Sequence, residues 1–173
     1  MPKVTKAVLA EIERREKELM EFYTQAKEKV SSPVCIKVFE TLLSGHQRHL
    51  ERLEEIRAHA AQGKSWLVDR WMWDVGLGIP NPLTKISEIV KEHPLCSAEE
   101  IKWLDTAMEK EEAYFHYLDN QAASALQSLT KRFYMSLAYE GRGYYLLLLD
   151  TKDCVAHPDL WQHPLEGVLV DGI

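Results

Sequence analysis

A glutamate and two histidines fall on the otherwise apolar faces of two amphipathic stretches. Glu16 lies four residues after Ile12 and three before Leu19, which places a carboxylate inside an apolar helical stripe. His46 and His49 share the apolar face of the following stretch, one helical turn apart. A buried carboxylate costs several kcal/mol unless it is paired, protonated or bound to a metal. Glutamate and histidine on facing helices are typical ligands of iron, manganese or zinc inside a helix bundle.

A third stretch adds acidic residues whose orientation the pattern leaves open. Glu109, Glu112 and His116 follow one another at steps of three and four. Glu112 lies at the edge of the apolar stripe, Glu109 lies further round the helix, and Glu111 falls within the stripe. The periodicity therefore does not choose cleanly among the three glutamates.

Four long amphipathic helices would position these residues. Apolar residues recur at steps of three and four, with few Gly or Pro residues between them, and this pattern is typical of helices. The expected helices cover residues of about 5–30, 33–62, 98–126 and 130–150. Ser32 and Pro33 indicate the start of the second helix, and Ser97 with Glu100 has the spacing of a capping box for the third.

The segments outside these helices differ in composition. Residues 64–96 hold three closely spaced tryptophans followed by Gly and Pro, and we expect a long crossover between the second and third helices. Residues 153–173 contain two His-Pro pairs and are expected to wrap irregularly around the bundle. The sequence shows no strand-like alternation, so residues 1–173 are predicted to be a single all-α domain built as a four-helix bundle.

The composition excludes several classes of function. The 173 residues are 46% hydrophobic and 28% charged, as in one globular domain, and the net charge of −6 disfavours nucleic acid and anionic membranes as partners. The longest apolar run, 144–149, is far shorter than the ~20 residues that span a bilayer, and the N-terminus turns acidic too soon for a signal peptide. Three widely spaced cysteines without a CxxC motif are expected to be free thiols. We therefore expect a soluble, cytoplasmic protein.

Each half of the chain resembles one half of a rubrerythrin, a member of the ferritin-like superfamily. In that family a helix with an E-x6-Y motif pairs with a helix that carries ExxH, and the unit occurs twice. Glu16 and Tyr23 match the first motif. The stretch after Phe39 matches the second, with His49 retained and His46 in place of the motif glutamate. The resemblance implies a ferritin-like bundle with the long crossover between its second and third helices.

The second half of the chain departs further from the family's pattern. The resemblance implies that Glu109 and Glu112 can both be ligands. In the fourth helix Gly141 falls where the family has glutamate, and Tyr144 falls where it has histidine. The predicted metal ligands are therefore Glu16, His46, His49, Glu109 and Glu112. The residues expected beside them are Tyr144, His116 and Glu140.

The missing glutamates bear directly on function. In rubrerythrins they bridge two irons, so their loss implies one metal ion rather than two: iron, with manganese or zinc as alternatives. The resemblance then implies a non-haem iron oxidoreductase that acts on peroxide or dioxygen, as a homodimer with an external electron donor. A second hypothesis is a metal-free bundle, with Glu16 hydrogen-bonded to His46 or His49, that serves as an oligomeric scaffold or binds a partner or small ligand. The sequence assigns no catalytic residue and leaves open whether the protein is an enzyme.

Overall fold

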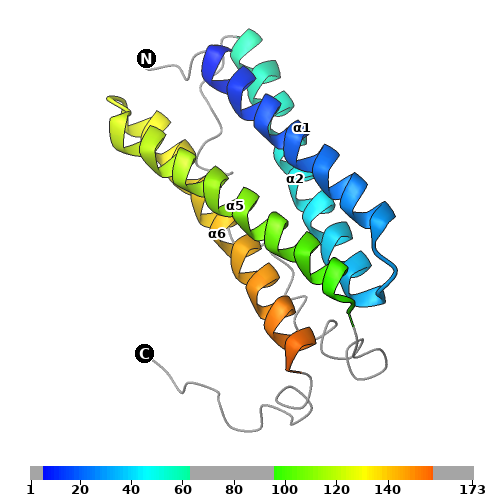
Figure 1. Cartoon of the computed structure of the whole chain (residues 1–173). Helices are drawn as coiled ribbons and strands as arrows, with labels where there is room; N and C mark the ends of the chain where they lie inside the picture. Colours follow the sequence, from blue (N-terminus) through cyan, green and yellow to red (C-terminus); the bar gives the residue numbers. More distant parts are fainter. Residues whose placement is uncertain (1–5, 63–95, 158–173) are drawn as a thin grey trace, which may run out of the picture.

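The structure, a computed structural model, describes residues 6–62 and 96–157. Four long helices make up this part of the chain (Figure 1): α1 (Lys6–Lys29), α2 (Pro33–Ala61), α5 (Ala98–Ser124) and α6 (Ser128–Ala156). No strand occurs in the described residues, and the predicted all-α class with four helices is confirmed. The crossover expected at 64–96, apart from Cys96, and residues 158–173 of the expected wrap lie outside the described residues.

The helix α6 is longer than predicted. It begins at Ser128 and ends at Ala156, whereas the apolar pattern had indicated an end near 150. Thr151, Cys154 and Val155 are buried and continue the apolar face of the helix. The polar residues between them mask this continuation in the sequence, so residues 153–156, expected in the wrap, are helical.

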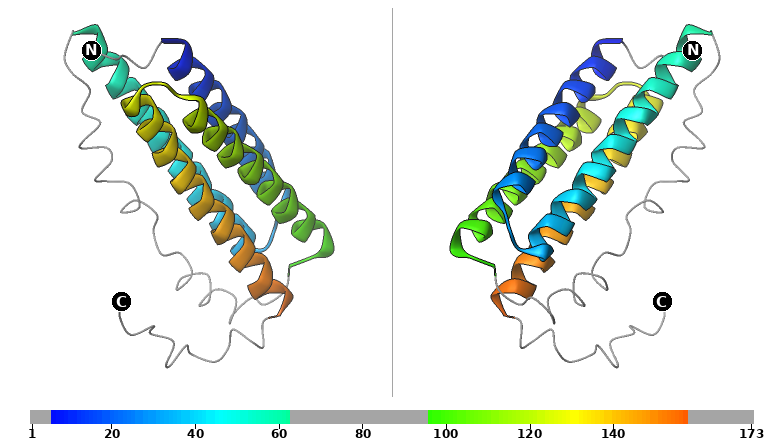
Figure 2. Two further views of the ribbon diagram at one scale, coloured as in Figure 1. Left: turned by 90° about the vertical axis from the view of Figure 1, so that its left-hand side faces the viewer. Right: turned by 90° about the vertical axis from the view of Figure 1, so that its right-hand side faces the viewer.

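Two helical hairpins lie side by side along one axis. The helix α1 packs mainly against α2, and α5 packs mainly against α6. In addition α1 contacts α5 and α2 contacts α6, so the four helices surround one interior (Figures 1 and 2). Among the described residues no helix is both long and apolar enough to cross a membrane.

One carboxylate joins the two hairpins at the end of the bundle where α5 begins. Ser97 is the N-cap of α5, and its hydroxyl accepts a hydrogen bond from the Glu100 backbone N–H (3.2 Å) while Glu100 Oε2 accepts one from the Ser97 N–H (2.8 Å). This confirms the predicted capping box. Glu100 Oε1 also accepts hydrogen bonds from the backbone N–H groups of Ser31 and Ser32, both at 2.7 Å. Burial would raise the pKa of Glu100, but these backbone donors lower it to about 2.

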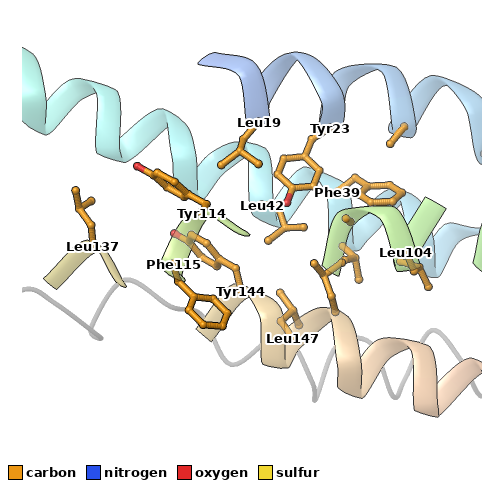
Figure 3. Close-up of a cluster of buried hydrophobic side chains, with 14 of the residues drawn as sticks. Leu19, Tyr23, Phe39, Leu42, Leu104, Tyr114, Phe115, Leu137, Tyr144 and Leu147 are labelled. Carbon is orange, nitrogen blue, oxygen red and sulfur yellow. The ribbon is translucent and has the colours of Figure 1, made fainter. Parts of the chain in front are cut away.

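Large side chains from all four helices fill the interior (Figure 3). They include Leu19, Tyr23, Phe39, Leu42, Leu104, Tyr114, Phe115, Leu137, Tyr144 and Leu147. Burying one such side chain contributes about 1.5–3 kcal/mol to folding. The same interior encloses Glu16, His46 and Glu111, whose exposed fraction is 0%. Because these groups have lost their contact with water, they must find partners inside the bundle.

Candidate metal centre

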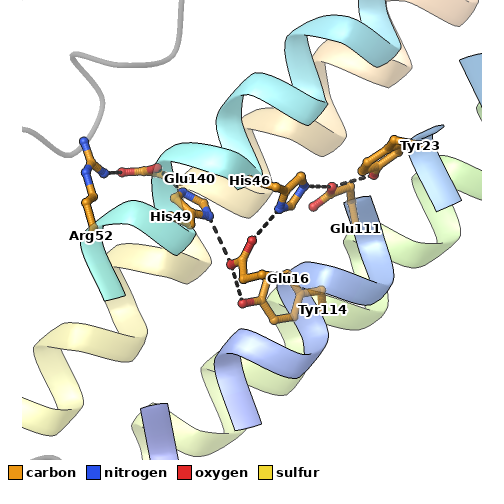
Figure 4. A network of polar contacts seen from close by, with 8 residues as sticks. All are labelled: Glu16, Tyr23, His46, His49, Arg52, Glu111, Tyr114 and Glu140. Carbon is orange, nitrogen blue, oxygen red and sulfur yellow. Dashed lines mark hydrogen bonds and ion pairs between the residues drawn. The ribbon is translucent and has the colours of Figure 1, made fainter. Parts of the chain in front are cut away.

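Three potential ligands from the first hairpin converge in the middle of the bundle (Figure 4). Glu16 comes from α1, and His46 and His49 come from α2, one turn apart. One ligand atom from each residue lies within 4.8 Å of the corresponding atoms of the other two. The structure therefore brings together the three residues that the apolar stripes of the sequence singled out.

The carboxylate of Glu16 is the centre of this group. Glu16 Oε2 lies 2.6 Å from His46 Nδ1, and Glu16 Oε1 lies 3.0 Å from His49 Nδ1. The Tyr114 hydroxyl on α5 donates a third hydrogen bond to Glu16 Oε1 at 2.6 Å. The Nδ1 edges of both imidazoles thus face one carboxylate.

The opposite edges of the two rings face two further carboxylates. His46 Nε2 lies 2.9 Å from Glu111 Oε1 on α5, and His49 Nε2 contacts Glu140 Oε2 on α6. Glu111 Oε1 also accepts a hydrogen bond from the Tyr23 hydroxyl on α1 at 2.6 Å. Each imidazole is therefore held between two carboxylates, and every helix of the bundle contributes to the arrangement.

The carboxylates keep both imidazoles protonated. Burial alone would lower the pKa of His46, but the charges of Glu111 and Glu16 outweigh it and raise the pKa to about 10. For His49, Glu16 and Glu140 likewise outweigh burial and raise the pKa to about 9. Burial would raise the pKa of Glu16, yet the two rings hold it below its ordinary range. At neutral pH each ring therefore donates a hydrogen bond from both nitrogens.

The positive and negative charges of this centre balance when the partly exposed Arg52 is counted with it. Arg52 Nη1 lies 3.1 Å from Glu140 Oε1, and its side chain is 21% exposed. The three carboxylates are then opposed by two imidazolium rings and one guanidinium. Paired charges of this kind are the condition under which ionised groups are tolerated in a protein interior.

The structure does not bring Glu109 and Glu112 to the centre, in contrast to the resemblance-based prediction. Both are exposed on α5, and the buried glutamate is Glu111. Glu111 lies four residues after the buried Ala107 and three before the buried Tyr114, so it follows the apolar stripe of the helix. The apolar stripe was the signal in the sequence that indicated Glu111, whereas the family motif indicated Glu109 and Glu112.

Of the three residues expected beside the ligands, two lie at the centre and one lies away from it. Glu140 contacts His49 Nε2 through its carboxylate. The Tyr144 ring lies with its centroid 5.2 Å from that of His46 and 5.9 Å from that of His49. His116 is exposed and lies 3.9 Å from Glu112, away from this group.

Two buried polar atoms at the centre have no hydrogen-bond partner among the described residues: Glu111 Oε2 and the Tyr144 hydroxyl. A glycine makes room for the tyrosine, because a Cβ at Gly45 would lie 2.2 Å from the Tyr144 hydroxyl oxygen. A Cβ at Gly141 would instead be limited by Phe115 Cβ at 3.2 Å, with Glu111 Oε2 at an ordinary contact distance of 3.9 Å. Buried polar groups without partners are rare in native proteins, and a bound ion or water is a common reason for them.

The donor set fits a transition metal. Two imidazoles and one carboxylate are the ligands typical of non-haem Fe(II) sites; imidazole also suits zinc, and carboxylate suits manganese. A ligating histidine usually donates its other ring N–H to a carboxylate, which fixes the orientation of the ring. His46 with Glu111 and His49 with Glu140 have this arrangement.

No family model, curated protein or solved structure matches this chain. The resemblance to rubrerythrins therefore stays a prediction from the motifs, and the function has to be inferred from the geometry of the buried centre.

Proposed function

We propose that this chain binds one divalent transition-metal ion through Glu16, His46 and His49. The observation that carries the proposal is the orientation of the two imidazoles. Their Nδ1 atoms both face the Glu16 carboxylate, while each Nε2 atom has a separate carboxylate of its own, Glu111 or Glu140. The inner edges supply ligand atoms, and the outer carboxylates hold the rings in place.

Charge supports a single ion. Binding would displace the Nδ1 protons of His46 and His49, so two positive charges leave as two positive charges enter. The net charge of the buried centre therefore stays unchanged, because two protons return to water as the divalent ion leaves it. A second divalent ion would need further carboxylates, but the two that remain at the centre, Glu111 and Glu140, already accept the outer N–H groups of His46 and His49.

We further propose that the protein is a ferritin-like non-haem iron oxidoreductase. Bound iron would supply one-electron redox chemistry toward peroxide or dioxygen. The chain's own residues would hold protons close by, because the Tyr114 hydroxyl donates to Glu16 and the Tyr144 hydroxyl, which has no partner among the described residues, would donate to a small ligand. The Glu140–Arg52 pair extends the charged network from His49 to the partly exposed arginine.

Metal content per chain tests the binding proposal. The purified protein would be loaded anaerobically with Fe(II), or separately with Mn(II) or Zn(II), then desalted and measured by elemental mass spectrometry. We expect about one ion per chain in the wild type and in His116→Ala, an exposed histidine on α5 that serves as a matched control. His49→Ala should lose the ion. A folded His49→Ala variant, by circular dichroism, that still binds one ion would contradict the proposal.

The iron oxidoreductase step has its own test. Anaerobic Fe(II)-loaded protein would be mixed with hydrogen peroxide, and electron paramagnetic resonance would follow the appearance of Fe(III). We expect one Fe(III) to appear per bound iron and to be reduced again by an added electron donor. Iron that stays Fe(II) under excess peroxide would contradict the redox proposal while leaving the binding proposal intact.

A second candidate function is a metal-free bundle that acts as a scaffold. The observation that favours it is that all four imidazole nitrogens already contact carboxylate oxygens. In that case α6 supplies the surface for a second copy, since Met135, Tyr139 and Leu146 are each more than half exposed. Wild-type protein that binds no ion but forms a dimer, which Tyr139→Glu dissociates in light scattering, would favour this candidate.

A further inference from the structure

Two cysteines distant in the sequence meet at the end of the bundle where the hairpins join. Cys35 lies in the first turn of α2, and Cys96 lies just before the N-cap of α5. Their Sγ atoms are 3.2 Å apart although the residues are separated by 61 positions. A disulfide bond is about 1.2 Å shorter than this separation, so a small shift of the side chains would allow it to form. We propose that Cys35 and Cys96 are a redox-active dithiol that a hydroperoxide converts into an intramolecular disulfide.

The environments of the two thiols assign them different roles. Cys35 is fully buried, whereas Cys96 is partly exposed and can meet a small oxidant. The hydrogen bond between the thiols lowers the pKa of Cys96 to about 7 and raises that of Cys35. Burial and the nearby Glu100 carboxylate oppose the lowering, while the Ser32 hydroxyl, 3.2 Å from Cys96 Sγ, supports it. Cys96 is the attacking thiolate and Cys35 is the resolving thiol.

The reaction then has two balanced steps. The Cys96 thiolate attacks one peroxide oxygen, the O–O bond breaks, and a sulfenic acid and hydroxide form. The Cys35 sulfur attacks the sulfenic sulfur, the S–O bond breaks, and water leaves as the disulfide forms. In total two thiols are oxidised and one hydrogen peroxide is reduced to two molecules of water. A dithiol reductant reverses the change by thiol–disulfide exchange.

The third cysteine provides a matched control. Cys154 is buried on α6, and burial raises the pKa of its thiol. Cys96 also acts electrostatically on the Cys154 thiol, but the close sulfur–sulfur contact, at 3.2 Å, is between Cys35 and Cys96. Oxidation should therefore join Cys35 to Cys96 and leave Cys154 reduced.

The test uses the full chain, reduced and then kept in a chelator so that no metal reacts with the peroxide. Limited hydrogen peroxide would be added, and free thiols would be counted after unfolding, together with the intact mass and a peptide map. The wild type and Cys154→Ser should each lose two thiols and the mass of two hydrogens, with the map placing the bond between Cys35 and Cys96. Cys35→Ser and Cys96→Ser should form no intramolecular bond.

Several results would overturn the inference. They are an unchanged thiol count in the wild type, a bond that includes Cys154, or oxidation of Cys96 to sulfinic acid without a cross-link. Chains that become joined only to one another on a non-reducing gel would also refute it. None of these outcomes depends on whether the buried centre binds metal, because the two cysteines lie outside that network.

Discussion

Metal affinity at the buried centre is expected to rise steeply with pH. The ion takes the place of the Nδ1 protons of His46 and His49, whose pKa values are about 10 and about 9. Well below pH 9 both rings carry the extra proton, so binding one ion releases two protons. The association constant should then increase about 100-fold for each pH unit, twice the logarithmic slope of a single-proton site.

The free energy of removing the protons sets the size of this effect. At pH 7 the solution is about three units below one pKa and about two units below the other, and each unit corresponds to ~1.4 kcal/mol. Displacing both protons therefore costs on the order of 7 kcal/mol at pH 7, and about 3 kcal/mol less at pH 8. Both side chains are buried, so solvent screening does not reduce these values appreciably.

Competition with a chromophoric chelator measures the slope. Zn(II), which has no redox chemistry, would be titrated at several pH values between 6.5 and 8.5, with the chelator's own pH dependence subtracted. Glu111→Gln leaves His46 facing one carboxylate instead of two, so its pKa should fall and the slope should flatten. A Kd that does not change with pH in the wild type would refute the reasoning, because the rings would then be neutral or the ion would bind elsewhere.

Three further predictions concern stability. In the metal-free protein the raised pKa values of the two histidines stabilise the folded state, and this contribution is fully present below pH ~6.5. It is lost as the pH rises through about 9 to 10, so the urea midpoint should fall between pH ~6.5 and about 10. An unchanged midpoint would mean that the rings are not protonated. Gly45→Ala places a carbon 2.2 Å from the Tyr144 hydroxyl oxygen and should lower the free energy of unfolding by about 1–3 kcal/mol in urea titration; equal stability would contradict the close packing. Glu100→Ala removes the acceptor of three backbone N–H groups and should lower the free energy of unfolding by about 1–3 kcal/mol. The control Glu99→Ala, at the exposed neighbouring residue, should lower it by less than about 0.5 kcal/mol. Similar losses in the two variants would show that the Glu100 carboxylate does not join the hairpins.

Local signals in the sequence predicted most of the described fold. Pro33 after Ser32, and Ser97 with Glu100, determine their helix starts through nearby backbone groups, so these starts could be predicted without tertiary information. The end of α6 could not, because the burial of Thr151 and Cys154 is a property of the folded chain that no local rule gives.

The candidate site was predictable only where the apolar stripe was unambiguous. Glu16, His46 and His49 interrupt clear stripes and are buried together. On α5 three glutamates lie within one turn, and packing of the second hairpin decides that Glu111 is the buried one. The Cys35–Cys96 contact joins residues 61 positions apart, and spacing in the sequence gives no indication of it.

The two tyrosine hydrogen bonds cross between the hairpins in a reciprocal way. The Tyr114 hydroxyl of the second hairpin donates to Glu16 of the first, and the Tyr23 hydroxyl of the first donates to Glu111 of the second. The second hairpin in isolation would leave Glu111 without either of its donors, Tyr23 and His46, and the first would keep the two imidazoles on Glu16 but lose the Tyr114 hydroxyl. The polar centre thereby makes the halves fold as one cooperative unit, and a chain cut between α2 and α5 should regain its structure only when both fragments associate.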